Sequence, residues 1–453
     1  MKYTPKKLFF GIAALAVAIA VVIVIIACSW IGGGGVAEAY SEPLSALVDS
    51  ETVYIMLALW IAVPIGLAGL LAVVIWTAKP VARAFRAKKH VKKAGGSRFA
   101  NLTQIDAQLA KAQDVAFDSM SLSAVCEGFR HYAAGKLGLY YDIADIRRFV
   151  AGMGISKLVI LRGISGTGKT SLAYAAGEYF GNPATIVPVQ PMWKERSDIV
   201  GYFNEFTKRF NETTLLCKLY EAGGRPDVYI TVLDEVNISR IEYYFAEFLS
   251  LLELPDPKKR ELDIVSDSWP NDPKRLRGGK LLLPENMWFI GTANNDDSTF
   301  AISDKVYDRA AVIDLDRKSQ PFVPQDVAGA HISFRELQQR FAEAKAAYHL
   351  TRRNRENLTR LDNYLSDVFR VSFGNRIMRQ IEDYVPILYA CGGTELEALD
   401  DILARKVLRK LEQQSPALLK SQIPGLVALL DEIFGAGHLP LSRDYLDRLA
   451  KTV

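Results

Sequence analysis

Cysteine is scarce in this chain of 453 residues, which contains only four. They are Cys28, Cys126, Cys217 and Cys391, and their separations match no metal-binding pattern. This scarcity argues against both a disulfide scaffold and a zinc site. The chain also lacks an internal repeat and a long low-complexity segment, so neither a solenoid nor an extended biased tail is expected.

Charged residues are absent from two long stretches, 8–31 and 54–78. Each stretch is almost wholly apolar, shows no amphipathic period and is long enough to cross the ~30 Å hydrocarbon core of a bilayer. We therefore predict two transmembrane helices within a membrane anchor at 1–94. The alternative for the first stretch is a cleaved signal segment, because 25–28 weakly resembles a bacterial lipoprotein cleavage site.

Basic residues are missing from the connector between the two stretches, where every charged residue is acidic. They follow the second stretch instead, at Lys79, Arg83, Arg86, Lys88, Lys89, Lys92 and Lys93. The positive-inside rule then places both termini in the cytoplasm, as in a two-pass protein of a bacterial inner (cytoplasmic) membrane. The basic run suits contact with anionic lipid, and nucleic acid is the alternative partner for it.

A complete phosphate-binding loop occupies 163–170, with the sequence Gly-Ile-Ser-Gly-Thr-Gly-Lys-Thr. It follows a largely apolar run and precedes a segment that begins like a helix. Its glycines let backbone N–H groups point at a triphosphate, and the helix N-terminus adds its positive dipole end. Lys169 would reach the β- and γ-phosphates, and the Thr170 hydroxyl would hold Mg²⁺. The predicted nucleotide contacts from this loop are Gly163, Ser165, Gly166, Thr167, Gly168, Lys169, Thr170 and Ser171.

Two acidic residues end a second apolar run, 228–235. Asp234 would be a further Mg²⁺ ligand and nucleotide contact, and Glu235 would orient and deprotonate the attacking water. An acid that only caps a strand is the alternative, but the phosphate loop upstream favours the catalytic roles.

Two more candidate residues follow later in the chain. Asn294 ends the apolar run 286–294 and would bridge the γ-phosphate and the lytic water; the alternative is an Asn that only makes a turn. Arg309 would reach the γ-phosphate of a neighbouring subunit and stabilise the transition state. Its alternative is an ordinary ion pair with Asp304 or Asp308.

Strands and helices alternate after residue 154, which predicts an α/β fold with a parallel sheet and helices on both faces. Ligand sites of such sheets lie at the carboxyl ends of the strands, where these motifs fall.

Four motifs together resemble an AAA+ ATPase: the phosphate loop (Walker A), LDEVNISR at 233–240, PENMWFIGTANN at 284–295 and DKVYDRA at 304–310. The resemblance covers 140–411 and is greatest to the dynein-related branch, which includes McrB-type motors and MoxR-like chaperones. It implies a P-loop AAA+ three-layer αβα sheet followed by an all-α lid. It also implies that Asn294 is sensor 1, Arg309 the arginine finger and Arg376 the sensor 2 contact to nucleotide.

Some residues depart from the McrB pattern. McrB-type proteins usually read MNTADRS where this chain has Ala-Asn-Asn-Asp-Asp-Ser at 293–298, and they have consecutive arginines near Arg309. These departures weaken any inference of GTP preference, so ATP is the expected nucleotide and GTP the alternative.

The predicted organisation has four parts. They are the membrane anchor at 1–94, a cytoplasmic helical linker at 95–139, the nucleotide-binding domain at 140–325, and a helical lid with a C-terminal extension at 326–453. A β-hairpin insertion is predicted at 253–284. Its tip is basic, with Lys274, Arg275 and Arg277, and either faces a pore or partner or is a solvated loop.

These features predict a membrane-anchored ATP hydrolase that uses ATP and Mg²⁺ at the subunit interfaces of a homo-oligomeric ring, expected to be a hexamer. Its expected work is to remodel or thread a protein partner at the cytoplasmic membrane face. One alternative is a motor on nucleic acid that acts in defence with a separate nuclease. Another is a nucleotide-gated assembly scaffold.

Overall fold

The computed structural model describes residue 66 and residues 97–111, 116–294 and 299–452. The predicted membrane spans at 8–31 and 54–78 fall outside these residues, apart from Gly66. Among the residues that are described, no helix is both long enough and apolar enough to cross a membrane. The anchor and its orientation therefore stay predictions. The chain divides into two compact units, 1–91 and 92–453, and the second is described below.

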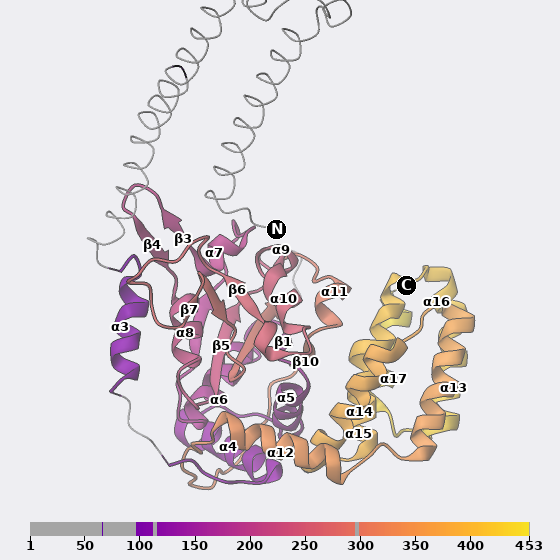
Figure 1. The fold of residues 1–453 in the computed structure, drawn as a ribbon. Coiled ribbons are helices and arrows are strands. Elements are labelled where there is room, and N and C mark those ends of the chain that lie inside the picture. Colours follow the sequence, from indigo (N-terminus) through magenta and orange to yellow (C-terminus); the bar gives the residue numbers. More distant parts are fainter. Residues whose placement is uncertain (1–65, 67–96, 112–115, 295–298, 453) are drawn as a thin grey trace, which may run out of the picture. The chain divides into compact units, whose positions relative to one another are not determined.

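A parallel sheet of five strands forms the centre of the second unit (Figure 1). Its strands are β1 (Leu158–Gly163), β2 (Thr185–Pro188), β5 (Tyr229–Asp234), β9 (Met287–Asn294) and β10 (Ala311–Asp314), in the order β10-β1-β9-β5-β2. The central strands β1, β5 and β9 are buried on both faces, which explains why their sequences are continuously apolar. The register pairs Gly163 with Asn294, so two predicted site residues meet at one end of the sheet.

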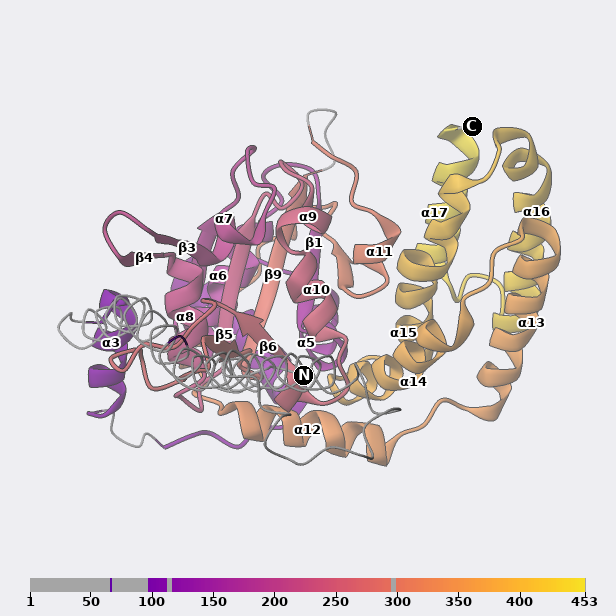
Figure 2. The ribbon, with the colours of Figure 1, turned by 45° about the horizontal axis from the view of Figure 1, so that its top comes forward.

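Helices cover both faces of this sheet (Figure 2). The helices α4 (Leu122–Leu137), α5 (Ile143–Ile155) and α6 (Lys169–Tyr179) share a core with Val159 and Leu161 of β1. The helices α8 (Thr214–Ala222) and α10 (Ala246–Leu252) share another core with Leu158 and Ile160. Because successive side chains of a strand point to opposite faces, β1 contributes to both cores. The predicted parallel α/β sheet between helical layers is confirmed.

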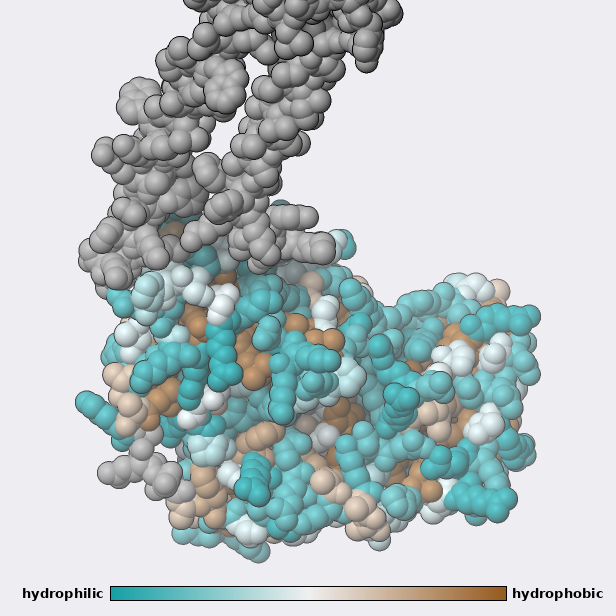
Figure 3. Space-filling view, viewed as in Figure 1, coloured by the Kyte–Doolittle hydropathy of each residue, from teal (hydrophilic) through white to brown (hydrophobic). Residues whose placement is uncertain are grey.

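Local sequence sets where several helices begin and end. Ser121 precedes α4, and its side chain accepts a hydrogen bond from the N–H of Ala124. The helix ends at Gly138, whose φ of 66° is accessible to glycine at little cost. Thr213 caps α8 in the same way as Ser121 caps α4. On the face shown in Figure 3, hydrophilic side chains predominate and hydrophobic ones are interspersed, as expected for helices that turn an apolar side inward.

Short elements interrupt the connections between the strands. After β2, α7 (Arg196–Val200) leads into an antiparallel hairpin of β3 (Gly201–Asn204) and β4 (Arg209–Glu212). The insertion predicted at 253–284 contains η1 (Pro257–Lys259), β6 (Glu261–Asp263), β7 (Leu276–Arg277) and β8 (Lys280–Leu282). Its strands pair in the order β6-β8-β7, so a third strand joins the expected hairpin. The remaining short helices are α9 (Ile241–Tyr244) and α11 (Asp304–Tyr307).

The segment predicted as a linker packs against the rest of the unit. Phe99, just before α3 (Ala100–Leu109), stacks on Phe210 of β4 with 4.9 Å between ring centroids. Arg98 forms ion pairs with Asp267 and Asp272 of the insertion, at 3.1 and 2.8 Å. Phe99 and Leu102 are buried in one core, and Leu122, Val125 and Phe129 in the other.

The C-terminal part is helical. It consists of α12 (Phe334–Ala347), α13 (Arg352–Phe369), α14 (Gly374–Ala390), α15 (Glu395–Ile402), a π-helix η2 (Leu403–Val407), a 3₁₀ helix η3 (Leu408–Gln413), α16 (Pro416–Phe434) and α17 (Pro440–Thr452). α14 packs against α5, and Ile381 of α14 belongs to the same core as Phe149 of α5. The helical part and the sheet therefore share one hydrophobic core.

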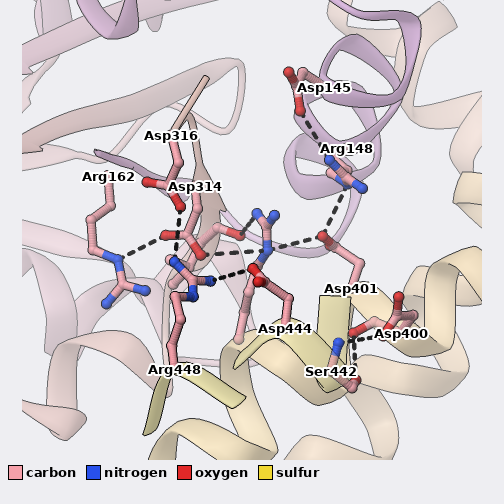
Figure 4. Close-up of polar contacts among 12 residues, drawn as sticks. Asp145, Arg148, Arg162, Asp314, Asp316, Asp400, Asp401, Ser442, Asp444 and Arg448 are labelled. Atoms are coloured by element: carbon pink, nitrogen blue, oxygen red, sulfur yellow. Dashed lines mark hydrogen bonds and ion pairs between the residues drawn. The ribbon is translucent and has the colours of Figure 1, made fainter. Parts of the chain in front are cut away.

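An ionic network also joins the sheet to the C-terminal helices (Figure 4). Arg162, the residue before Gly163, pairs with Asp314 at the end of β10 at 2.7 Å. Arg405 of η2 lies 3.8 Å from Asp314 and 3.0 Å from Asp401. Burial alone would raise the pKa of Asp314, but the guanidinium groups of Arg405 and Arg162 hold it below its usual value. The end of the phosphate-loop strand is thus connected to the helical part through paired charges.

Candidate functional site

The phosphate loop has the backbone conformation that its glycines permit. Gly166 and Gly168 have φ values of 78° and 93°, in the region that favours glycine. The backbone at Gly163 passes close to the carbonyl oxygen of Leu315. A Cβ at this position would lie 2.4 Å from that oxygen, so only glycine permits the approach. Ser165 and Gly166 are exposed at the turn of the loop, and Ser171 lies in the first turn of α6. A side chain at these glycines would distort the loop that the sequence predicts to bind phosphate.

Lys169 is held inside this loop. Its ammonium group donates to the carbonyl oxygens of Gly163 and Ile164, at 3.1 and 2.7 Å, and the residue is 6% exposed. The hydroxyl of Thr167 donates to the same Ile164 carbonyl at 3.0 Å. These three hydrogen bonds hold the loop closed around the lysine, in the position from which an ammonium group can meet a phosphate.

The two predicted Mg²⁺ ligands are in direct contact. The Thr170 hydroxyl donates to Oδ1 of Asp234 at 2.7 Å, although the residues are 64 apart in the chain. Mg²⁺ prefers oxygen ligands and usually takes one or two from protein, completing its shell with phosphate and water. No group of three or more His, Cys, Asp or Glu side chains suited to a metal occurs in the described part of the chain. The hydroxyl and carboxylate therefore fit Mg²⁺ bound together with a nucleotide.

Glu235 has an unusual backbone conformation. Its φ is 57°, which costs of order 1–3 kcal/mol for a residue with a side chain. Its N–H donates to Oγ1 of Thr292 at 2.9 Å, and that hydroxyl donates to Oδ1 of Asp234 at 2.8 Å. The side chain is exposed at the end of β5, next to Asp234. This strained turn presents a carboxylate beside the predicted metal position, where a general base is required.

Asn294 is the last residue of β9, at the same sheet end as the phosphate loop. Its carbonyl accepts a hydrogen bond from Nδ2 of Asn237 at 2.8 Å, and Nδ2 also donates to Thr299 at 2.9 Å. Asn237 thus fixes the backbone where the predicted sensor residue leaves the strand.

Three residues of this site carry no role predicted from the sequence, although Asn237 and Thr292 lie within two of the motifs. Thr292 connects Asp234 to Glu235, Asn237 holds the backbone of Asn294, and the Tyr141 hydroxyl donates to the carbonyl of Gly168 at 3.0 Å. Burial raises the pKa of Tyr141, which keeps the phenol protonated as a donor. Thr292 had a signal in the sequence, because it is a hydroxyl residue inside the apolar run 287–293.

Arg309 and Arg376 lie together, away from the phosphate loop. Nη2 of Arg309 is 2.6 Å from Oε2 of Glu253, and Nη2 of Arg376 is 2.7 Å from Oε1 of the same carboxylate. The carbonyl of Arg309 accepts from the hydroxyl of Ser156, which precedes β1. The phosphate loop follows β1, whereas the two arginines lie near the start of that strand. The strand is roughly 20 Å long at 3.3 Å per residue, and this length separates the loop from the arginines. The structure brings Arg309 and Arg376 together, but not to their own chain's phosphate loop.

A family model described as "Domain of unknown function (DUF8727)" matches residues 327–453. This range coincides with the C-terminal helical part. No curated protein matches the chain.

Two solved structures are distantly similar to this chain. One is the crystal structure of a "putative ATPase" from Cytophaga hutchinsonii, with a TM-score of 0.40 and 11% identity over 67% of this chain and 87% of that one. Another is a full-length MCM homolog from Methanopyrus kandleri, with a TM-score of 0.35 and 10% identity over 64% of this chain and 62% of that one. These similarities are distant, so the description of this chain as a P-loop α/β protein rests on its own strand order and phosphate loop.

Proposed function

We propose that this chain is an AAA+ ATPase of the dynein-related branch that hydrolyses ATP with Mg²⁺ at sites shared between subunits of a ring. The observation that carries the proposal is the contact between Thr170 and Asp234, with Lys169 and Glu235 at the same end of the sheet. A phosphate loop, a metal carboxylate and an exposed carboxylate in this arrangement suit the hydrolysis of a nucleoside triphosphate.

Each residue at this end of the sheet has a separate task. Lys169 binds the β- and γ-phosphates, and Thr170 and Asp234 hold the metal ion, which neutralises phosphate charge when it is bound. Glu235 takes a proton from the attacking water. The oxygen of that water bonds to the γ-phosphorus, and the bond from this phosphorus to the β-phosphate oxygen breaks. The Asn294 side chain orients that water.

The positions of Arg309 and Arg376 favour a site between subunits. Neither guanidinium group can cross the length of β1 to the loop of its own chain, since an arginine side chain is much shorter than the strand. Both face a cavity of about 610 Å³ at the opposite end of the strands. We infer that they contact the nucleotide of an adjacent copy, as in a closed ring such as a hexamer.

We propose that the partner is a protein at the cytoplasmic face of a membrane. The segments 8–31 and 54–78 would tether the ring to that membrane. Phe206, between β3 and β4, is 99% exposed, and Met192, between β2 and α7, is 83% exposed. Apolar side chains this exposed are available for contact with another protein.

A motor on nucleic acid is the second candidate, because the tip of the insertion is basic. A cavity of about 640 Å³ is lined by Lys258, Lys274, Arg275, Arg277 and Lys280, with Arg225 beside them. If DNA strongly stimulates hydrolysis by the full-length chain and the effect falls with salt, the nucleic-acid motor is favoured over the protein remodeller.

Substitution of Glu235 by Gln tests the hydrolytic function. It preserves shape but removes the base, so ATP binding is expected to persist while turnover falls about 100-fold or more. The measurements are nucleotide affinity and phosphate release by the full-length chain, with Glu247→Gln, on the surface of α10, as the control. Full hydrolysis by the Glu235→Gln chain would contradict the proposal.

A further inference from the structure

One carboxylate binds both arginines that the proposed function places at the neighbouring nucleotide. Glu253 directly follows α10, and its two oxygens pair with Arg309 at 2.6 Å and Arg376 at 2.7 Å. Arg309 lies between α11 and β10 of the sheet region, whereas Arg376 lies in the first turn of α14 in the helical part. Glu253 is therefore the point where the two parts of the chain bring their arginines together.

The location of Glu253 is unfavourable without these partners. It caps the C-terminus of α10, where the helix dipole is negative and repels an acidic side chain. Two guanidinium groups compensate that repulsion, and their own like charges are held close by the shared carboxylate. Each of the three residues has a partner of opposite charge in this set.

The set retains donors and positive charge for a further anion. Arg309 uses Nη1 for the carbonyl of Lys305 and Nη2 for Glu253, and each of these nitrogens carries a second N–H. The side chain of Arg376 is 53% exposed. One carboxylate cannot neutralise two guanidinium groups, so a net positive charge remains to meet a phosphate.

Other charged groups line the same cavity. Arg260 is bound by the carbonyl of Leu254 through Nε and Nη2, at 3.1 and 2.8 Å. The cavity is also lined by Lys157, Glu285, Asp308 and Arg379. Among the contacts described for this cavity, Glu253 is the carboxylate that joins the two arginines.

We propose that Glu253 is a positioning residue that aligns Arg309 and Arg376 as a pair of donors for the γ-phosphate in the adjacent subunit. This inference rests on the proposed function. A pair aligned before the nucleotide arrives loses little freedom when charge develops on the phosphoryl oxygens, which is the condition for effective electrostatic catalysis. Glu253 itself does not touch the nucleotide.

The test compares Glu253→Gln with Glu253→Asp in the full-length chain. Loss of a charged hydrogen-bonding partner should lower kcat by about tenfold to a hundredfold. The KM for ATP should change less than about twofold, because the phosphate loop supplies most of the ground-state binding and the aligned pair acts on charge that develops in the transition state. Glu253→Asp should recover part of the rate. The matched control is Glu247→Gln in α10, which should leave kcat unchanged. The carboxylate of Glu247 lies 3.5 Å from Arg196.

A second measurement separates positioning from a structural ion pair. In a chain with Arg376→Ala, Glu253→Gln should lower kcat by a smaller factor than it does in the unaltered chain, because one of the two groups it aligns is gone. A further loss of similar size, or a rise in kcat in the single Glu253→Gln variant, would overturn the inference; the rise would mean that Glu253 competes with phosphate.

The inference and the proposed function can fail separately. If Arg309→Ala abolishes turnover but Glu253→Gln leaves kcat unchanged, only the role of Glu253 is wrong. If Arg309→Ala and Arg376→Ala both leave turnover unchanged, the shared site itself is wrong.

Discussion

At the scale of single residues, the site depends on a short chain of hydrogen bonds that connects three elements. Thr170 of α6 and Thr292 of β9 both donate to Oδ1 of Asp234, and Thr292 also accepts from the N–H of Glu235. These bonds fix the carboxylate of Asp234 and the strained backbone of Glu235 relative to the phosphate loop. The geometry of catalysis is thus set by a threonine that contacts neither phosphate nor water in the proposed mechanism.

Replacement of Thr292 by valine should therefore slow hydrolysis. The change keeps the shape but removes the hydroxyl, and a hydrogen bond to a charged group contributes roughly 1.5–3 kcal/mol. Since 1.36 kcal/mol corresponds to a factor of ten, kcat should fall about tenfold or more. Thr292→Ser, which keeps the hydroxyl, should retain most of the rate. Equal rates for the valine and serine variants, measured by phosphate release, would refute this role.

The sequence was informative where the site is local and less so where it depends on tertiary contacts. The phosphate loop and the Asp234-Glu235 pair are contiguous motifs, so their types and spacing could be interpreted directly. Glu253 meets Arg309 across 56 residues of chain, and Thr292 meets Glu235 across 57. Such contacts are set by strand order and helix packing, which a single sequence does not display.

At the scale of elements, the helical part is attached to the sheet by buried charges as well as by apolar packing. The π-helix η2 contributes Arg405 and Lys406, which are 6% and 8% exposed. The sequence predicted helix here, but not the π-helical turn, whose wider backbone presents these two side chains to the sheet region. Lys406 donates to Oε1 of Gln380 at 2.7 Å and to the carbonyls of Tyr307 and Asp308. It therefore connects the helical part to the residues just before Arg309.

Lys406 should make the stability of the fold depend on pH. Burial lowers its pKa from 10.5 to about 7 in the folded chain. Between these values the unfolded chain binds a proton that the folded chain lacks, so the free energy of unfolding from this group rises with pH from about 7 to 10.5. Below about 7 both states are protonated and its contribution no longer changes.

The variant Lys406→Met should reduce the rise of the free energy of unfolding with pH. The measurement is thermal unfolding of the full-length chain at several pH values from 7 to 10, with the exposed Lys420→Met as the control. The melting temperature of the Lys406→Met chain should rise less with pH than that of the unaltered chain. Parallel profiles for the two chains would show that the amine of Lys406 is not the group responsible.

At the scale of the whole molecule, the sheet separates two chemically different ends. The carboxyl ends of β1, β5 and β9 carry the phosphate loop, Asp234, Glu235 and Asn294. Arg309 and Arg376 lie near the start of β1. The parallel sheet and helical layers could be predicted from alternating apolar runs, but the pairing of the two arginines could not, because it requires knowing how α14 packs against α5.

This separation makes an isolated copy incomplete in the proposed mechanism. The phosphate loop of one copy needs the arginines of another, so activity should depend on assembly. The predicted membrane anchor would favour assembly by confining copies to one surface, where their effective concentration is raised.

The most direct test of the shared site mixes two inactive chains. Lys169→Ala removes the phosphate-binding lysine but keeps Arg309, whereas Arg309→Ala has the opposite lesion. Coexpressed full-length chains should recover ATP hydrolysis, because some interfaces then combine an intact loop with an intact arginine. Coexpression of Arg309→Ala with the doubly substituted Lys169→Ala, Arg309→Ala chain should recover none. Activity of the first mixture no higher than that of its separate components would contradict a site shared between subunits.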